Sequence, residues 1–290
     1  MGNAECGISQ LPFCTPSFAF QLPMPPITLA IPYHDPAGGL TDQLARLLPR
    51  IGELFERIAV DASAEANPQG LALLRGAGTH IEQTRRAFVD GVPQMGQIRR
   101  AVVAAALRLD ASWIFYCDGD RLLHWLDHYP AELVAALRRI PEHDLTVFGR
   151  TRRAFESHPH TQRATEQIIN DVYAAISGHD WDVTAAARGL SRRAAQAIVA
   201  GCHEDSFGVD AVWPLFLQQA GGFTMTEIKT EGLEFETATQ YRQEVAAAGG
   251  DETWKRLIDG DARRWVFRLN LARIEVAAMI PYQKAVIQSR

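Results

Sequence analysis

Two aspartates separated by one glycine carry the clearest chemical signal in the sequence. Asp118, Gly119 and Asp120 directly follow the apolar run 112–117. Carboxylates at positions i and i+2 of an extended segment project to the same side, and a glycine between them lets the backbone turn closely. The pair can therefore present oxygens to one hard cation, Mg²⁺ or Mn²⁺, that also binds a diphosphate. A turn that caps the next helix is the alternative interpretation.

The segment before this pair is typical of a central strand. Residues 112–117 read Ser-Trp-Ile-Phe-Tyr-Cys, an aromatic and β-prone run, and the alanine-rich residues 97–109 before them favour a buried helix. Ligands of open α/β sheets bind outside the carboxyl ends of the strands. The position of the two aspartates therefore favours a binding role over a purely structural one.

Earlier residues predict the strand, helix, strand unit of a parallel sheet. Residues 27–32 form an apolar run that ends in a proline and turn-forming residues. Residues 41–56 carry apolar side chains at three-and-four spacing, and residues 57–61 then look like a second strand. Such a unit indicates parallel strands. A weaker helix is predicted at 68–75 and a third strand at 79–83.

The second half of the chain is expected to be mainly helical, with Ser191 as one helix N-cap. No internal repeat is visible. The predicted parts are a Pro-rich N-terminal arm (1–26), a main α/β domain (27–235) and a helical C-terminal extension (236–290). Within the main domain, further helices are predicted at 131–139, 161–177, 191–200 and 209–220, and strands at 145–148 and 223–229.

Composition excludes several classes of function. The formal net charge of the 290 residues is −5 and basic residues are scattered among acidic ones, so we expect no nucleic-acid partner. We see no signal peptide and no membrane span, and four cysteines without paired spacing favour reduced thiols in a cytoplasmic protein. The apolar content of the C-terminal extension favours a homodimer. Hydrolase, P-loop and dinucleotide-binding motifs are absent from the sequence.

The order and spacing of these segments resemble the GT-A glycosyltransferases, which bind nucleotide-diphosphosugars. The resemblance covers about residues 27–235 and implies a Rossmann-like fold, a mostly parallel central sheet flanked by helices. In this family Asp118 and Asp120 would hold Mg²⁺ or Mn²⁺ through an Asp-X-Asp motif. The resemblance assigns nucleotide-sugar binding to Pro32, Tyr33, His34, Asp35, Asp61, Ser63, Gln97, Arg100, Asp118 and Gly119.

The resemblance also implies a later acidic residue that serves the acceptor, either a small molecule or a glycan. Asp210 is preferred over Asp205 as this catalytic residue, and Glu204 competes for the place. An acid favoured by the N-terminus of a helix is the alternative interpretation of Asp210. Asp180 and Asp182 correspond to a neighbourhood that contacts the sugar or acceptor in relatives, although helix capping explains them equally well.

The chain departs from the family in one respect. Retaining relatives often use a late histidine as a third metal ligand, but no histidine follows His203. Glu231, Glu234 or water could replace it.

Three hypotheses follow from the residues and the resemblance. The first is a metal-dependent glycosyltransferase. The second is a nucleotidyltransferase of related fold, which is disfavoured because its Gly-rich first loop with Lys and Arg is absent. The third is a nucleotide-binding protein of the same fold that has lost catalysis.

Overall fold

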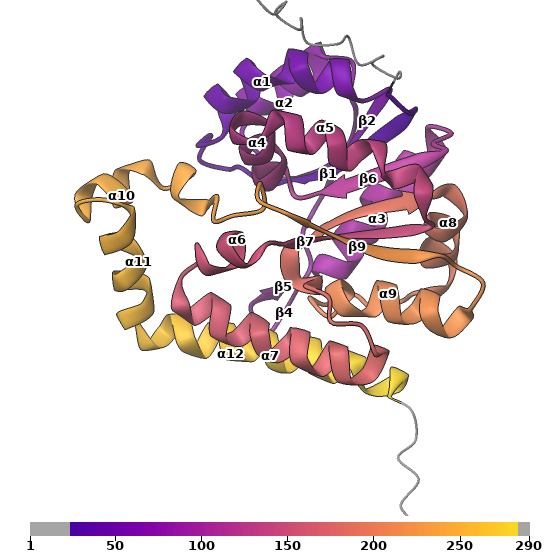
Figure 1. Ribbon diagram of the computed structural model, residues 1–290. Coiled ribbons are helices and arrows are strands. Elements are labelled where there is room, and N and C mark those ends of the chain that lie inside the picture. The colour runs from indigo at the N-terminus through magenta and orange to yellow at the C-terminus, as the bar shows by residue number, and fades with distance from the viewer. Residues whose placement is uncertain (1–23, 284–290) are drawn as a thin grey trace, which may run out of the picture.

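The computed structural model describes residues 24–283 as an α/β fold around one central sheet. Seven strands lie in the order β3-β2-β1-β6-β8-β7-β9, and helices cover both faces (Figure 1). Residues 1–23, nearly all of the predicted Pro-rich arm, lie outside the described residues. The predicted fold class, a mostly parallel sheet flanked by helices with a helical C-terminal region, is confirmed.

The N-terminal half forms the parallel part of the sheet, as its apolar runs predict. Strand β1 is buried almost throughout and pairs in parallel with β2 on one side and β6 on the other. Strands covered on both faces read as continuous apolar runs, which is why this half could be predicted. Its elements are β1 (Ile27–Tyr33), α1 (Thr41–Leu54), β2 (Arg57–Ser63), α2 (Pro68–Gly76), β3 (His80–Thr84), β4 (Phe88–Val89), β5 (Val92–Pro93), α3 (Met95–Arg108) and β6 (Trp113–Cys117).

Helix α4 (Gly119–His128) begins directly after β6, which corrects the extended geometry expected for the two aspartates. Asp118 is the N-cap and keeps an extended conformation, whereas Gly119 and Asp120 already belong to the helix. Trp125 of α4 packs edge-on against an aromatic ring of β6, so the apolar side of the helix covers the sheet. The pair is therefore presented by a strand end and a first helical turn.

Strand β8 (Ala187–Ser191) lies where the sequence gives no strand signal. It pairs antiparallel with both β6 and β7 and so occupies a central place in the sheet. At Gly189 an added Cβ would come 2.7 Å from a side-chain carbon of Ile140. Close packing, rather than β propensity, therefore determines the composition of this strand.

The remaining predicted elements are confirmed to within a few residues. The Ser191 hydroxyl accepts a hydrogen bond from the Ala194 N–H and caps α8, as predicted. The elements are α5 (Pro130–Arg138), η1 (Ile140–Glu142), β7 (Leu145–Arg150), α6 (Arg152–Glu156), α7 (His160–Ser177), η2 (Val183–Ala185), α8 (Arg192–Gly201), α9 (Val209–Ala220) and β9 (Met225–Thr230).

The C-terminal extension folds back over the main domain. Helix α12 runs along α7 and also contacts α9 (Figure 1). This placement brings Arg268, Leu271 and Glu275 of α12 to a cavity that Asp118, at the carboxyl end of β6, also lines. The elements are η3 (Thr237–Thr239), α10 (Arg242–Ala247), α11 (Asp251–Gly260), α12 (Ala262–Met279) and η4 (Ile280–Tyr282).

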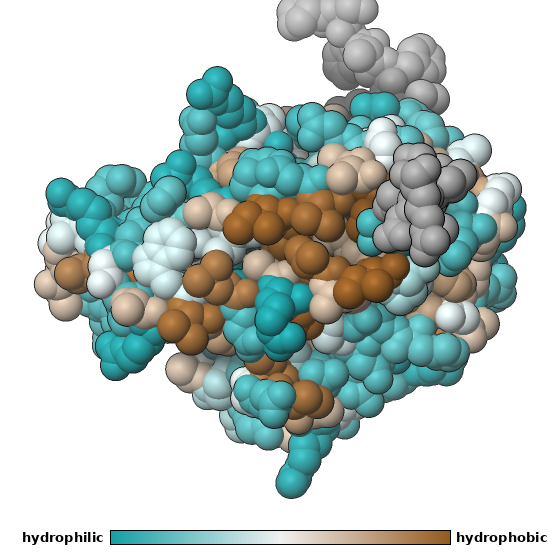
Figure 2. Space-filling view, turned by 90° about the horizontal axis from the view of Figure 1, so that it is seen from below, coloured by the Kyte–Doolittle hydropathy of each residue, from teal (hydrophilic) through white to brown (hydrophobic). Residues whose placement is uncertain are grey.

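A hydrophobic area is visible on the face formed by α7 and α12 (Figure 2). Exposed apolar side chains of these helices include Ile168, Val266 and Leu269. A homodimer, predicted from the apolar content of the extension, would find its contact surface here and stays a prediction. No helix within the described residues is long and apolar enough to cross a membrane.

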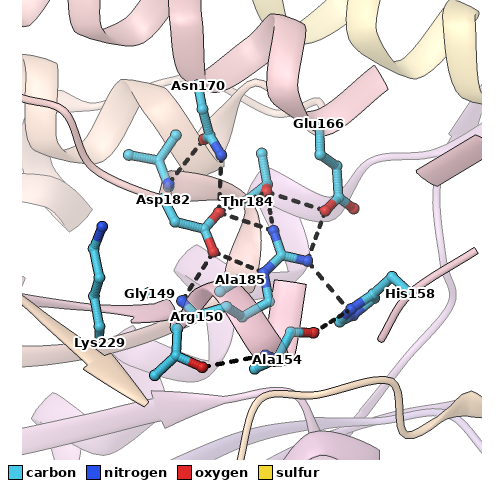
Figure 3. A network of polar contacts seen from close by, with 12 residues as sticks. Gly149, Arg150, Ala154, His158, Glu166, Asn170, Asp182, Thr184, Ala185 and Lys229 are labelled. Carbon is cyan, nitrogen blue, oxygen red and sulfur yellow. Dashed lines mark hydrogen bonds and ion pairs between the residues drawn. The ribbon is translucent and has the colours of Figure 1, made fainter. Parts of the chain in front are cut away.

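A buried ionic network joins the end of β7 to α7 and to the segment before β8 (Figure 3). The Arg150 guanidinium binds the Asp182 carboxylate through Nε at 2.7 Å and through Nη2 at 2.8 Å. Its Nη1 lies 2.7 Å from Glu166. Burial alone would raise the pKa of Asp182, but Arg150 outweighs it and holds that pKa well below its ordinary value. The three charges are therefore mutually dependent.

Arg150→Met is expected to lower the free energy of unfolding by about 3–5 kcal/mol, because the buried Asp182 would lose its cation and Glu166 would lose the nearer of its two arginines. The neighbouring Arg152 is the matched control, since its side chain is 90% exposed and pairs with Glu156. Arg152→Met should leave the free energy of unfolding almost unchanged, because its ion pair is exposed to solvent. Urea unfolding at pH 7 measures both values, and equal losses would contradict the structural role of the network.

Candidate functional site

Asp118 lies at the carboxyl end of β6. Its Oδ1 accepts a hydrogen bond from the Tyr116 hydroxyl, and its Oδ2 accepts one from Arg99 Nη2 at 3.4 Å. The side chain makes no cap hydrogen bond to α4, so the alternative of a capping aspartate does not describe it. The carboxylate is held by side chains and remains directed toward the space beside the strand end.

Asp120 lies in the first turn of α4 among other acidic groups. Its Oδ1 accepts a hydrogen bond from the Arg121 backbone N–H at 2.9 Å, and its Oδ2 accepts one from the Gln240 amide. Burial raises the pKa of Asp120 to about 6, with further contributions from the carboxylates of Glu236 and Asp118. Such crowding of negative charge would be relieved by a cation.

The two aspartates can supply only part of a metal site. Among residues 24–283, no group of three or more His, Cys, Asp or Glu side chains is arranged to hold a metal ion. Mg²⁺ in proteins often binds one or two carboxylates and takes its other ligands from phosphate oxygens and water. The pair therefore fits a cation that arrives together with a diphosphate.

The acids considered as substitutes for a late histidine lie apart from this pair. Glu231 and Glu234 both form ion pairs with Arg153. Glu236, two residues further on, instead lies near Asp120 and contributes to its raised pKa. The acidic residue that follows the sheet and reaches the site is therefore Glu236.

A first cavity of about 350 Å³ opens where the two aspartates meet the end of β1. Its walls are largely apolar and a few polar groups converge on it, which is typical of small-molecule sites. Six of the residues predicted to bind the nucleotide-sugar or the metal line this cavity, namely Pro32, Tyr33, His34, Asp118, Gly119 and Asp120. The lining residues are Pro32, Tyr33, His34, Leu40, Arg86, Phe88, Pro93, Met95, Ile98, Asp118, Gly119, Asp120 and Gln240.

Asp35 and Ser63 do not line this cavity but form hydrogen bonds with residues that do. The Asp35 carboxylate accepts hydrogen bonds from the backbone N–H groups of Gly39 at 2.8 Å and Leu40 at 3.0 Å, so it fixes the loop after β1. Ser63 Oγ lies 2.8 Å from Nδ1 of His34, which does line the cavity.

Asp61 also acts through a neighbour. Its buried carboxylate pairs with Arg86 and accepts a hydrogen bond from the Thr84 hydroxyl at 2.8 Å. Arg86 lines the first cavity, whereas Asp61 does not. A buried acid at the end of a strand needs a buried partner of opposite charge. The prediction of Asp61 could therefore have led to Arg86, the arginine that pairs with it.

The charged residue of α3 that reaches the site is Arg99, which lies between the predicted Gln97 and Arg100. Gln97 is exposed, and Arg100 pairs with Asp205. Arg99 is buried and pairs with both Asp118 and Asp210. Helical spacing places position 99 on the same face as the buried Val102 and Val103, so the sequence did contain this signal.

A second cavity of about 170 Å³ lies on the other side of Asp118, which lines both cavities. Helix α12 of the C-terminal extension forms part of its wall, so the site does not end at residue 235. The lining residues are Arg99, Asp118, Arg121, Gln162, Thr165, Glu166, Ile169, Thr184, Ala186, Phe207, Asp210, Glu236, Thr237, Arg268, Leu271 and Glu275.

Of the acids predicted to serve the acceptor, Asp210 lines the second cavity. It pairs with Arg99 and lies 3.8 Å from Arg188 Nη2. Asp205 is exposed and forms an ion pair with Arg100 of α3, and Asp180 is also exposed. Asp182 belongs to the Arg150 network, and none of these last three lines either cavity.

Comparisons with known proteins address the fold. No protein family model and no curated protein sequence matches the chain. A crystal structure of glucosyl-3-phosphoglycerate synthase from Mycobacterium tuberculosis is similar, with a TM-score of 0.54 and 11% identity over 89% of this chain and 80% of the other. A structure of that protein with Mn²⁺, UDP-glucose and phosphoglyceric acid gives a TM-score of 0.46 and 11% identity, covering 84% and 80%. At 11% identity the likeness to the first of these structures shows a shared fold.

Proposed function

We propose that the protein is a metal-dependent glycosyltransferase that moves a sugar from a nucleotide-diphosphosugar to an acceptor hydroxyl. The observation that carries the proposal is the place of Asp118, which borders both cavities. A nucleotide in the first cavity would have its diphosphate at the aspartate pair and its sugar directed toward the second. The fold shared with a glucosyl-transferring synthase supports this assignment.

In the proposed reaction the acceptor oxygen bonds to the anomeric carbon as the bond from that carbon to the diphosphate oxygen breaks. The products are the glycoside, a nucleoside diphosphate and one proton. Asp118 and Asp120 would hold Mg²⁺ or Mn²⁺, which neutralises charge on the leaving diphosphate.

Arg99 and Asp210 have complementary parts in this site. Arg99 binds Asp118 directly, and Asp210 holds Arg99 through a buried ion pair. We therefore assign Asp210 a positioning role for Arg99 and the metal-binding carboxylate. Arg86, held by Asp61, would face the nucleotide from the opposite wall of the first cavity.

Binding of a nucleotide-sugar is the first test. At about 100 times its dissociation constant, a ligand of the native state adds about 2.7 kcal/mol of stability, which should raise the melting temperature by about 5 °C. UDP-, GDP-, ADP- and TDP-sugars are to be screened by thermal shift with and without Mn²⁺. We expect one nucleotide to stabilise the protein only with the metal, and Asp118→Asn/Asp120→Asn to abolish the shift.

Asp127→Asn is the control on the same helix, because Asp127 pairs with Arg46 away from both cavities. It should bind as the wild type does. Turnover then separates the remaining hypotheses: a nucleoside diphosphate as product supports glycosyl transfer, and pyrophosphate released from a nucleoside triphosphate indicates nucleotidyl transfer. Metal-dependent binding without turnover of any donor would favour the catalytically silent protein.

The raised pKa of Asp120 predicts how stability depends on pH in the absence of metal. Because the folded protein holds the proton up to about pH 6, the folded state binds more protons than the unfolded state between about pH 4 and 6, and its stability falls as pH rises through this window. In EDTA, Asp120→Asn should therefore stabilise the protein by about 1–2 kcal/mol at pH 8, the partial exposure of the carboxylate reducing the effect.

The same substitution should have little effect on stability at pH 4, where the aspartate is already protonated. Urea unfolding of both proteins at pH 4 and pH 8 measures the difference. Saturating Mn²⁺ with the stabilising nucleotide should reverse the order at pH 8. An Asp120→Asn protein that is less stable than the wild type in EDTA at pH 8 would show that the carboxylate is not under electrostatic strain.

A further inference from the structure

The arginines of the second cavity are already paired with acids. Arg99 pairs with Asp210, and Arg121 Nε lies 3.6 Å from Glu236. The third, Arg268, lies 3.5 Å from Glu166 and donates a second bond to Gln162 at 2.7 Å. A phosphate or carboxylate entering this cavity would compete with these acids, whereas Arg99 Nε, which has no hydrogen-bond partner, can be satisfied by a neutral acceptor such as a hydroxyl oxygen.

Two buried carboxyl oxygens in the same cavity have no hydrogen-bond partner. Glu236 Oε2 and Glu275 Oε2 are unpaired, although these residues are only 6% and 5% exposed. Burial raises the pKa of Glu275 well above its ordinary value. Unpaired buried carboxyl oxygens are costly, and because a protonated Glu275 offers an O–H as well as a carbonyl oxygen, they are best satisfied by a ligand that both donates and accepts hydrogen bonds, such as one that carries hydroxyl groups.

A third cavity of about 270 Å³ adjoins the second and shares Gln162, Thr237 and Arg268 with it. We call it the aromatic cavity, because it is lined by Phe235, Tyr241, Trp254 and Phe267. The Trp254 ring lies 6.0 Å from Phe235 and 5.9 Å from Tyr241, between centroids.

Polar groups also line the aromatic cavity, among them Thr161, Glu244 and Arg264. A hydrocarbon chain would leave these groups unpaired, whereas a sugar ring offers C–H faces to the aromatic rings and hydroxyls to the polar rim. The mixture therefore favours a saccharide over a lipid.

We propose that the acceptor is an uncharged saccharide of at least two rings, with its reacting ring in the second cavity and the next ring against Trp254 in the aromatic cavity. This inference rests on the proposed function and names its acceptor class. It differs from the anionic acceptor in the name of the structural neighbour, a glucosyl-3-phosphoglycerate synthase.

The test measures release of nucleoside diphosphate with Mn²⁺ and the donor identified by binding. Neutral acceptors are glucose, maltose and cellobiose, and their anionic counterparts are glucose 6-phosphate, glucuronate and 3-phosphoglycerate. We expect release to rise with the neutral saccharides and more with a disaccharide than with glucose, while the anions stay at the rate without acceptor.

Trp254→Ala should raise the KM for the disaccharide about tenfold and leave kcat and the KM for glucose within about twofold. Trp254→Phe, which keeps an aromatic face, should restore most of the affinity. Trp265→Ala is the matched control, because this tryptophan lies on α12 outside all three cavities.

Glu275→Leu separates binding from structural damage. Replacing an unpaired buried carboxyl by an apolar side chain should leave thermal stability unchanged or higher, whereas the KM for both neutral acceptors should rise. A loss of stability with unchanged KM would show that Glu275 is structural. Quenching of tryptophan fluorescence by maltose, with Mn²⁺ and the nucleoside diphosphate of the identified donor bound, gives a readout independent of turnover and should disappear in Trp254→Ala.

The nucleotide-binding step distinguishes two kinds of failure. Absence of metal-dependent nucleotide binding overturns the proposed function and this inference with it. Normal nucleotide binding with 3-phosphoglycerate or glucose 6-phosphate as the preferred acceptor, or with no response to any neutral saccharide, overturns the inference alone.

Discussion

The buried guanidinium of Arg99 is the interaction on which the candidate site depends. It joins Asp118 at the end of β6 to Asp210 at the start of α9, and it also lies over the Tyr116 ring, 5.6 Å from its centroid. A buried charge is tolerated only when it is paired, so the helix, the strand and the second helix are held in one geometry. The junction between the two cavities is therefore a rigid part of the molecule.

The same principle recurs across this end of the sheet. Arg86 is held by Asp61, Arg150 by Asp182 and Glu166, and Arg188 lies beside Asp210. Each cation is held by an acid of the same chain, so the charge of these buried arginines is already balanced within the fold, and Arg86 also forms part of the wall of the first cavity. Long charged side chains thus define cavity shape here as strictly as apolar packing does elsewhere in the core.

The sequence predicted the parallel half of the sheet because its strands are apolar throughout and its helices are periodic. It did not predict β8, whose residues are selected by close contact with Ile140 and by burial of Arg188. Nor was α4 predicted, since an Asp-Gly-Asp turn suits an extended segment as well as a helix start and the next helix was placed only at 131–139.

Within the site, the sequence predicted residues whose role is indicated by their neighbours along the chain, and it missed residues that reach the site from distant parts of the chain. Asp118 and Asp120 are recognisable from their spacing and from the strand before them. Gln240 and Glu275 come from the C-terminal extension, and nothing in their neighbourhood along the chain shows which strand end they approach. Arg99 lay within reach, because helical periodicity places it on the buried face of α3.

The first and second cavities are built from different parts of the chain, and the C-terminal extension contributes mainly to the second. The first cavity is lined by residues up to Asp120 and by Gln240, which bonds Asp120, whereas α12 contributes walls of the second cavity from later in the chain. During translation the residues that line the first cavity, apart from Gln240, therefore emerge before those of α12. In evolution, exchange of the terminal helices can alter what enters the second and aromatic cavities while the strand order of the sheet stays the same.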